Sequence, residues 1–133
     1  MTIAYWCVLA AIAFPYVWFG VANANSKGMR DNNYPRDFAQ SAEGLAKRAL
    51  GAHLNAFEAL PGFAAAVIIA QAVHAAQGTV DVLALAWVGL RLLHGVFYLN
   101  DKGGLRSLAW FAAVACVVGL FVAAAMAPYS ALS

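Results

Sequence analysis

The sequence predicts an all-α integral membrane protein, an antiparallel bundle of four transmembrane helices. Hydrophobic residues make up 64% of its 133 residues and charged residues only 11%, against roughly 45–50% and 25% in an ordinary soluble domain. Four apolar segments are each long enough to cross a bilayer as a helix, which requires about 20 residues. No segment shows the strict alternation that a transmembrane β-barrel requires. This composition excludes both a soluble domain and a disordered chain.

Each predicted span has its own justification. The first, residues 3–24, carries no charge, and we expect it to stay in the membrane and not to be cleaved as a signal peptide. The second, residues 41–76, carries its charged residues in its first half. The third, residues 80–100, and the fourth, residues 105–127, are apolar stretches separated by a short polar turn. Because short turns connect antiparallel neighbours, residues 1–133 are predicted to form one four-helix domain.

The basic residues are distributed unevenly among the predicted connections. Those in or beside the first and third connections are Lys27, Arg30, Arg36, Lys47, Arg48, Lys102 and Arg106. The turn predicted at residues 77–79 and both chain ends carry no Lys or Arg. The positive-inside rule then places the loops at residues 25–40 and 101–104 in the cytoplasm and both termini outside. A bacterial inner membrane is the expected location, with an organelle membrane as the alternative.

Polar side chains gather at the predicted cytoplasmic end of the bundle, where a bilayer makes each of them costly. They are Arg48, His53, Asn55 and Glu58 in the second span, Arg91, His94 and Tyr98 in the third, and Arg106 and Ser107 in the fourth. At 100° per residue, Arg48 and Asn55 lie about 20° apart and Glu58 about 60° away, whereas His53 points elsewhere. The third-span residues form one stripe, because their spacings are three and four. We expect the two stripes to face each other, with Glu58 and Arg91 as partners.

The polar cluster has two interpretations. Polar residues can simply hold membrane helices together by hydrogen bonds, but this cluster exceeds what one ion pair requires. Three arginines against one glutamate favour an anionic, hydrogen-bonding ligand that enters from the cytoplasm. No metal is expected, because Cys7 and Cys116 lie in apolar runs and no His cluster has ligand spacing. A net charge of +2 without a basic stripe argues against nucleic acid as a partner.

Three motifs follow one another in a recognisable order along these spans. The first runs from Arg48 to Glu58, with Ala52-His53 and Asn55 inside it, and is followed by Pro61. The second runs from Gly89 to Tyr98 and contains Arg91 and His94, and the third is Leu105-Arg106-Ser107. Together they resemble the MAPEG family, the membrane-associated proteins in eicosanoid and glutathione metabolism. Within that family, the chain resembles a bacterial-type member that is similar to the microsomal glutathione transferases.

The resemblance implies a homotrimer with sites between neighbouring protomers, and glutathione as a co-substrate held near the cytoplasmic face. It implies that the tripeptide is bound by Asn55, Glu58, Arg91, His94 and Tyr98, to which the polar stripe adds Arg48. It assigns stabilisation of the thiolate to Arg106, with Ser107 as a nearby candidate for the same task. An arginine-rich site with one glutamate complements two carboxylates and an ammonium, and a cationic environment favours the nucleophilic thiolate.

The leading prediction for function is a glutathione-dependent transferase or peroxidase that acts on lipophilic electrophiles or lipid hydroperoxides. The alternative is a non-catalytic trimeric scaffold or accessory subunit, and position 51 favours it. This position is Gly51, where many family members carry an arginine that contacts glutathione. If the chain does not bind glutathione, Gly51→Arg is expected to restore some affinity, provided that the remaining site has kept its geometry. Trp110 stands where some animal members have tyrosine, and Lys27, Arg30 and Asp31 receive no role. A small transporter fits less well, because four spans without a repeat offer little for alternating access.

The distribution of basic residues makes the orientation testable. A cysteine introduced in place of Asn32 should be protected from a membrane-impermeant thiol reagent in intact cells and should react once the cells are opened. The reason is that the loop around position 32 is predicted to face the cytoplasm. Reaction from outside in intact cells would reverse the proposed topology. A cysteine placed at position 2 should show the opposite pattern.

Overall fold

The computed structural model describes residues 1–27 and 31–128, so Arg30 lies outside the described part. Its helices are α1 (Ile3–Ala24), the short α2 (Phe38–Ser41), α3 (Gly44–Ala72), α4 (Gln77–Leu99) and α5 (Gly103–Ala125). No strand occurs in the part of the chain that the structure describes. The four longer helices are each long and apolar enough to cross a membrane, which confirms the predicted all-α fold with four spans.

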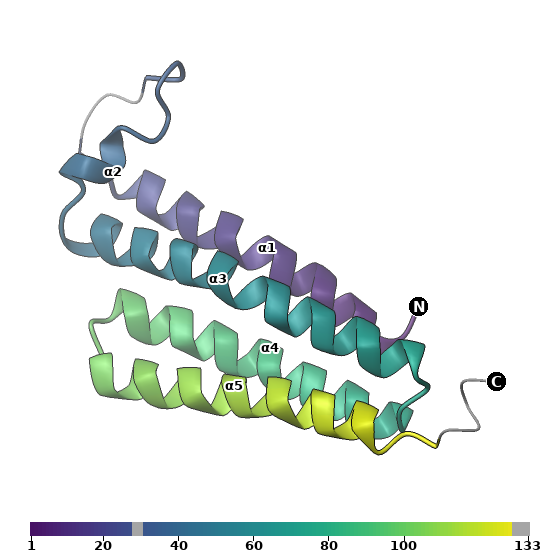
Figure 1. Cartoon of the computed structure of the whole chain (residues 1–133). Coiled ribbons are helices and arrows are strands. Elements are labelled where there is room, and N and C mark those ends of the chain that lie inside the picture. Colours follow the sequence, from purple (N-terminus) through teal and green to yellow (C-terminus); the bar gives the residue numbers. More distant parts are fainter. Residues whose placement is uncertain (28–30, 129–133) are drawn as a thin grey trace.

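The four long helices form two antiparallel pairs, α1 with α3 and α4 with α5, which pack against one another (Figure 1). Helix α3 contacts both helices of the second pair, and α4 also contacts α1. The short helix α2 and the α4–α5 connection lie at one end of the bundle, here called the loop end. The start of α1 and the α3–α4 connection lie at the opposite end. Helices α3 and α5 begin at the loop end and α4 ends there, so the predicted site residues share that end.

Helices α3 and α4 both end in Schellman motifs, although neither motif uses glycine. After α3, His74 has a left-handed backbone with φ of 55°, and the two hydrogen bonds of the motif measure 3.1 and 2.9 Å. After α4, Asp101 takes the same role with φ of 58°. The early end of α3 makes it shorter than the predicted span 41–76, and residues 73–76 form the connection. The turn predicted at residues 77–79 is wrong, because these residues form the first turn of α4.

Alanine is the most frequent buried residue between the helices, and each of the four long helices contributes buried alanines. Small side chains let helix backbones approach closely, as is typical inside membranes. One large contact fills the space that remains, where Phe63 of α3 stacks on Trp87 of α4 with ring centres 3.8 Å apart. Most large apolar side chains face outward instead, for example Leu54, Ile68 and Val118. This arrangement suits a protein whose outer surface meets lipid.

His53 connects α3 to α1. Its Nδ1 donates a hydrogen bond of 2.7 Å to the carbonyl oxygen of Pro15. Its ring also contacts those of Phe19 and Phe57, with ring centres 5.2 and 5.1 Å away. The side chain therefore points towards α1 and away from the polar stripe of α3, in agreement with the helical phase.

Asp81 anchors the start of α1 at the opposite end of the bundle. Its Oδ1 accepts a hydrogen bond of 2.9 Å from the backbone amide of Ala4 and another of 2.9 Å from Nε2 of Gln77. The Ala4 amide belongs to the first turn of α1, where no carbonyl of the same helix can accept from it. A carboxylate also complements the positive end of the helix dipole. Sequence reasoning missed this contact, which joins residues 77 positions apart.

Replacing Asp81 should test this anchor. Asp81→Ala leaves the amide of the fully buried Ala4 without its acceptor, and the expected loss of stability is about 1–3 kcal/mol. Asp81→Asn keeps an oxygen at this position and should lose less. Unfolding of the purified protein in mixed detergent, followed by circular dichroism, measures both. Equal effects of the two substitutions would contradict the role of the oxygen as acceptor.

Candidate functional site

A chain of hydrogen bonds connects Arg91, Asn55 and Glu58 between α4 and α3. Nη2 of Arg91 donates to Oδ1 of Asn55 over 2.8 Å and to the Asn55 carbonyl over 3.2 Å. Nδ2 of Asn55 donates in turn to Oε2 of Glu58 over 3.3 Å. Arg91 is only 3% exposed, whereas Glu58 lies on the protomer surface. The side-chain amide of Asn55 therefore links a buried cation to an exposed carboxylate through hydrogen bonds to both.

The predicted direct pairing of Glu58 with Arg91 is wrong. Among the described residues, Arg91 has its hydrogen bonds to Asn55 and no ion pair joins it to Glu58. The physical reason is that an asparagine side chain can accept and donate at the same time. It satisfies the guanidinium directly and leaves the Glu58 carboxylate at the surface of the chain. The three predicted residues do form one network, with a different order of contacts.

Tyr98 is the centre of a second group of side chains at the loop end. Its ring meets that of His94, which is 3% exposed, edge-on with ring centres 5.7 Å apart. The guanidinium carbon of Arg106 lies 4.4 Å from the centre of the Tyr98 ring, a cation–π distance. The hydroxyl end of Tyr98 lies against the α3 backbone at Gly51. Side chains from α4 and α5 and a backbone position of α3 thus meet here.

Gly51 leaves space that Tyr98 fills. A Cβ atom built on Gly51 would lie 2.6 Å from Cζ and 2.7 Å from Cε1 of Tyr98, well inside van der Waals contact. The sequence identifies Gly51 only as a missing arginine, because the partner that covers it comes from another helix. One signal in the sequence was its location, since glycine in a helix interior is unfavourable unless something approaches the backbone closely.

Arg48 and Ser107 complete the set of predicted residues. Nε of Arg48 donates a hydrogen bond of 2.9 Å to the carbonyl oxygen of Leu99. Leu99 is the last residue of α4, so Arg48 satisfies one of the carbonyls that a helix end leaves open. Nη1 and Nη2 of Arg48 take no part in this hydrogen bond. Ser107 is exposed in the first turn of α5, next to Arg106.

A cavity of about 260 Å³ adjoins the Arg91–Asn55–Glu58 network. It is lined by residues of α3, α4 and α5: Asn55, Glu58, Ala59, Gly62, Phe63, Trp87, Arg91, Trp110, Ala113, Val114 and Val117. Three polar side chains therefore border a cavity whose other walls are apolar. A ligand with a charged part and a lipophilic part could make favourable contacts with both.

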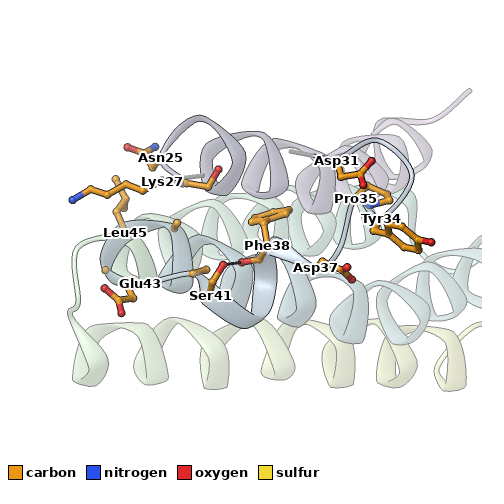
Figure 2. A pocket seen from close by; sticks show the side chains of 14 residues that line it. Asn25, Lys27, Asp31, Tyr34, Pro35, Asp37, Phe38, Ser41, Glu43 and Leu45 are labelled. Atoms are coloured by element: carbon orange, nitrogen blue, oxygen red, sulfur yellow. Dashed lines mark hydrogen bonds between the residues drawn. The ribbon is translucent and has the colours of Figure 1, made fainter. Parts of the chain in front are cut away.

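A larger cavity of about 630 Å³ lies beside α2 and has a different character (Figure 2). Among the residues that the structure describes, its charged lining residues are Lys27, Asp31, Asp37 and Glu43, three carboxylates against one ammonium. Figure 2 also shows the hydrogen bond of 3.2 Å from Oγ of Ser41 to the Phe38 carbonyl. The structure thus locates Lys27 and Asp31 at this acidic cavity and not in the cationic cluster. Its charge does not suit the anionic ligand expected from the sequence.

The comparisons with known proteins give one match. A family model described as the MAPEG family matches residues 3–126, nearly the whole chain. Comparison with curated proteins and with solved structures gives no match. Within residues 1–27 and 31–128, no group of three His, Cys, Asp or Glu side chains could hold a metal ion.

The hydrogen-bond order predicts which pairs are energetically coupled. In double-mutant cycles, Asn55→Ala and Arg91→Met should be strongly non-additive, because either change removes a bond of about 1.5–3 kcal/mol that involves a charge. Glu58→Gln and Arg91→Met should be coupled more weakly, because Asn55 lies between the two charges and both contact it. Unfolding in mixed detergent gives the four free energies of each cycle. Strong coupling of Glu58 with Arg91 and none with Asn55 would instead support a direct ion pair.

Proposed function

We propose that this chain, which belongs to the MAPEG family, is a glutathione-dependent transferase or peroxidase that acts on lipophilic electrophiles or lipid hydroperoxides. The observation that carries the proposal is the grouping of charged side chains at one end of an apolar bundle. There, Arg91, Asn55 and Glu58 form one network and Arg106 lies over Tyr98. Buried polar groups of this extent are costly in a membrane and point to a function.

The charges at the loop end complement those of glutathione, which has two carboxylates and one ammonium. Glu58 is exposed and has Asn55 as a donor, which leaves carboxylate lone pairs for the ammonium. A guanidinium has five N–H donors, and the hydrogen bonds of Arg91 and Arg48 described above use only Nη2 and Nε respectively. Their other donors are suited to the carboxylates. His94 and Tyr98 are expected to add hydrogen-bonding contacts beside them.

Arg106 is the expected partner of the glutathione sulfur, with Ser107 as a neighbouring hydroxyl donor. A nearby guanidinium stabilises a thiolate relative to the thiol, and the thiolate is the nucleophile. Arg106 lies in the first turn of α5, where the helix dipole adds positive potential. In the transferase reaction, the thiolate sulfur forms a bond with an electrophilic carbon while the bond from that carbon to its leaving group, for example a halide, breaks. In the peroxidase reaction, the thiolate attacks the terminal hydroperoxide oxygen, the O–O bond breaks, and the released alkoxide takes a proton and leaves as the alcohol. The glutathione sulfenic acid so formed then reacts with the thiol of a second glutathione and gives the disulfide and water.

The apolar walls of the smaller cavity are suited to the lipophilic substrate. Trp110, Val114 and Val117 of α5 line it opposite a polar border. A substrate dissolved in lipid could reach these walls between helices, whereas glutathione would enter from water at the loop end. This division needs no metal, and none is proposed. The loop end is expected to face the cytoplasm.

A homotrimer is part of the proposal. Glu58 lies exposed near the middle of α3, at a depth where an uncovered carboxylate is unfavourable in lipid. A neighbouring protomer with a site at the shared surface would cover it. Crosslinking of the protein in native membranes, followed by denaturing electrophoresis, tests this assembly.

A non-catalytic scaffold is the second candidate, and Gly51 is the observation that favours it. A glycine offers no carboxylate contact to glutathione, which could reduce affinity. The rescue expected for Gly51→Arg does not fit the structure, because even a Cβ at position 51 overlaps Tyr98. Titration of purified wild-type protein with glutathione by calorimetry separates the two candidates. Absence of binding would support the scaffold.

Arg106→Leu tests the proposed chemistry. It should lower the thiolate fraction of bound glutathione at pH 7 about tenfold, equivalent to about 1.4 kcal/mol, and should change affinity much less. The reason is that Arg91 and Arg48 would still bind the carboxylates. The near-ultraviolet difference spectrum on adding glutathione reports the thiolate. Arg36→Leu, which removes the same charge from an exposed loop position, is the control.

Two results would contradict the enzymatic proposal. One is glutathione binding to the wild-type protein without a thiolate signal and without turnover of a generic electrophile such as an aryl halide. The other is an equal loss of thiolate in Arg106→Leu and Arg36→Leu, since general charge and not the position of Arg106 would then be the cause.

A further inference from the structure

We infer that Gly51 is a positioning residue: its lack of a side chain lets Tyr98 lie against α3, and Tyr98 in turn holds the Arg106 guanidinium at the site. The inference rests on the proposed function, because the consequence of positioning Arg106 is a more stable glutathione thiolate. It also changes the interpretation of Gly51. The glycine is required for the arrangement of this site, and its role is more than the absence of an arginine that would contact glutathione.

The first observation is steric. Three atoms at the hydroxyl end of Tyr98 occupy the volume that a Cβ on Gly51 would need, two of them at 2.6 and 2.7 Å. Real Cβ atoms do not approach other heavy atoms so closely. Any other residue at position 51 therefore forces Tyr98 to move. Gly51 differs in this from Gly89, which is also inside a helix but has open space within 4 Å of the point that a Cβ would occupy.

The second observation is the location of Arg106 over the Tyr98 ring. The guanidinium carbon lies 4.4 Å from the ring centre, where the negative face of the ring attracts a cation. An arginine near a helix start otherwise has many accessible rotamers, and ordering it costs conformational entropy. The ring of Tyr98 reduces that cost before any ligand binds. His94, which meets the same ring edge-on, supports it from within α4.

The two contacts together form a path through three helices. The backbone of α3 at Gly51 sets where the Tyr98 ring lies, and the ring sets where the cation of α5 lies. A preorganised cation stabilises developing or full negative charge more than a mobile one, because no reorganisation accompanies the reaction. Substituting Gly51 should therefore affect the thiolate more than the binding of glutathione, although residue 51 need not touch the sulfur.

The experiment compares Gly51→Ala with the matched control Gly89→Ala. Both add one methyl group to a helix interior and both raise helix propensity. In Gly51→Ala, the thiolate fraction of bound glutathione at pH 7 should fall about three- to tenfold, with affinity within about threefold of wild type. In Gly89→Ala, neither quantity should change. Calorimetry gives the affinity and the near-ultraviolet difference spectrum gives the thiolate fraction.

Two Tyr98 variants keep the test decisive if Gly51→Ala folds poorly. Tyr98→Leu removes the ring without crowding α3 and should lower the thiolate fraction as Gly51→Ala does. Tyr98→Phe keeps the ring and should recover most of that loss. The double variant Gly51→Ala with Tyr98→Leu should be no worse than Tyr98→Leu alone, because both changes act through the same ring.

The outcomes separate the inference from the proposed function. A wild-type protein that binds glutathione as the neutral thiol, or not at all, overturns the proposed function. A wild-type thiolate signal that Gly51→Ala and Tyr98→Leu both leave unchanged overturns only the inference. Additive losses in the double variant also overturn it, since residues 51 and 98 would then act independently. If Gly89→Ala lowered the thiolate fraction as much as Gly51→Ala, the loss would come from adding a methyl group to any helix and not from moving Tyr98. That result would also overturn the inference.

Discussion

The burial of the Arg91 guanidinium between apolar helices is the constraint on which the rest of the site depends. A cation that is 3% exposed at membrane depth must find its partners within the protein, because solvation is lost and an unpaired charge is strongly unfavourable. Asn55 supplies two oxygens, and the ring of Trp87 lies 5.9 Å from the guanidinium carbon. Shifting α4 by one turn would move Arg91 about 5.4 Å along α3. The contacts of this side chain therefore favour one register of the two helices.

That register brings the other contacts of the site into place. From Arg91 towards the end of α4, the chain reaches Tyr98 and then Leu99, while the partners on α3 run backwards from Asn55 to Gly51 and Arg48. This opposite progression is what antiparallel helices require. The alanine-lined core permits it, because small side chains let the helix backbones approach closely enough for these contacts. The polar contacts can then decide the offset.

Hydropathy was sufficient to predict the four spans, the alternating direction of the spans placed the polar residues towards one end, and helical phase grouped them into stripes. All three follow from the sequence without knowledge of contacts between helices. The order of contacts within the site was not predictable in this way. Asn55 and Glu58 differ by about 60° around α3, so the charge of Glu58 made it the natural partner of Arg91, whereas the amide of Asn55 took that role. Gly51 and Asp81 were missed or misread for the same reason, since their partners lie on other helices. The end of α3 was missed because His74, not glycine, adopts the left-handed backbone.

The exposed end of the network is the Glu58 carboxylate. Glu58 receives a hydrogen bond from Asn55 and faces outward near the middle of α3, where a charged side chain facing lipid costs about 2.5–3.5 kcal/mol on insertion scales. Moving the carboxylate inward to Arg91 would remove this cost, but Asn55 already occupies the guanidinium. The carboxylate therefore needs a polar partner from outside the protomer. In the proposed function, the ammonium of glutathione or a polar group of a neighbouring chain would meet this requirement, so the two are alternative partners for the same carboxylate.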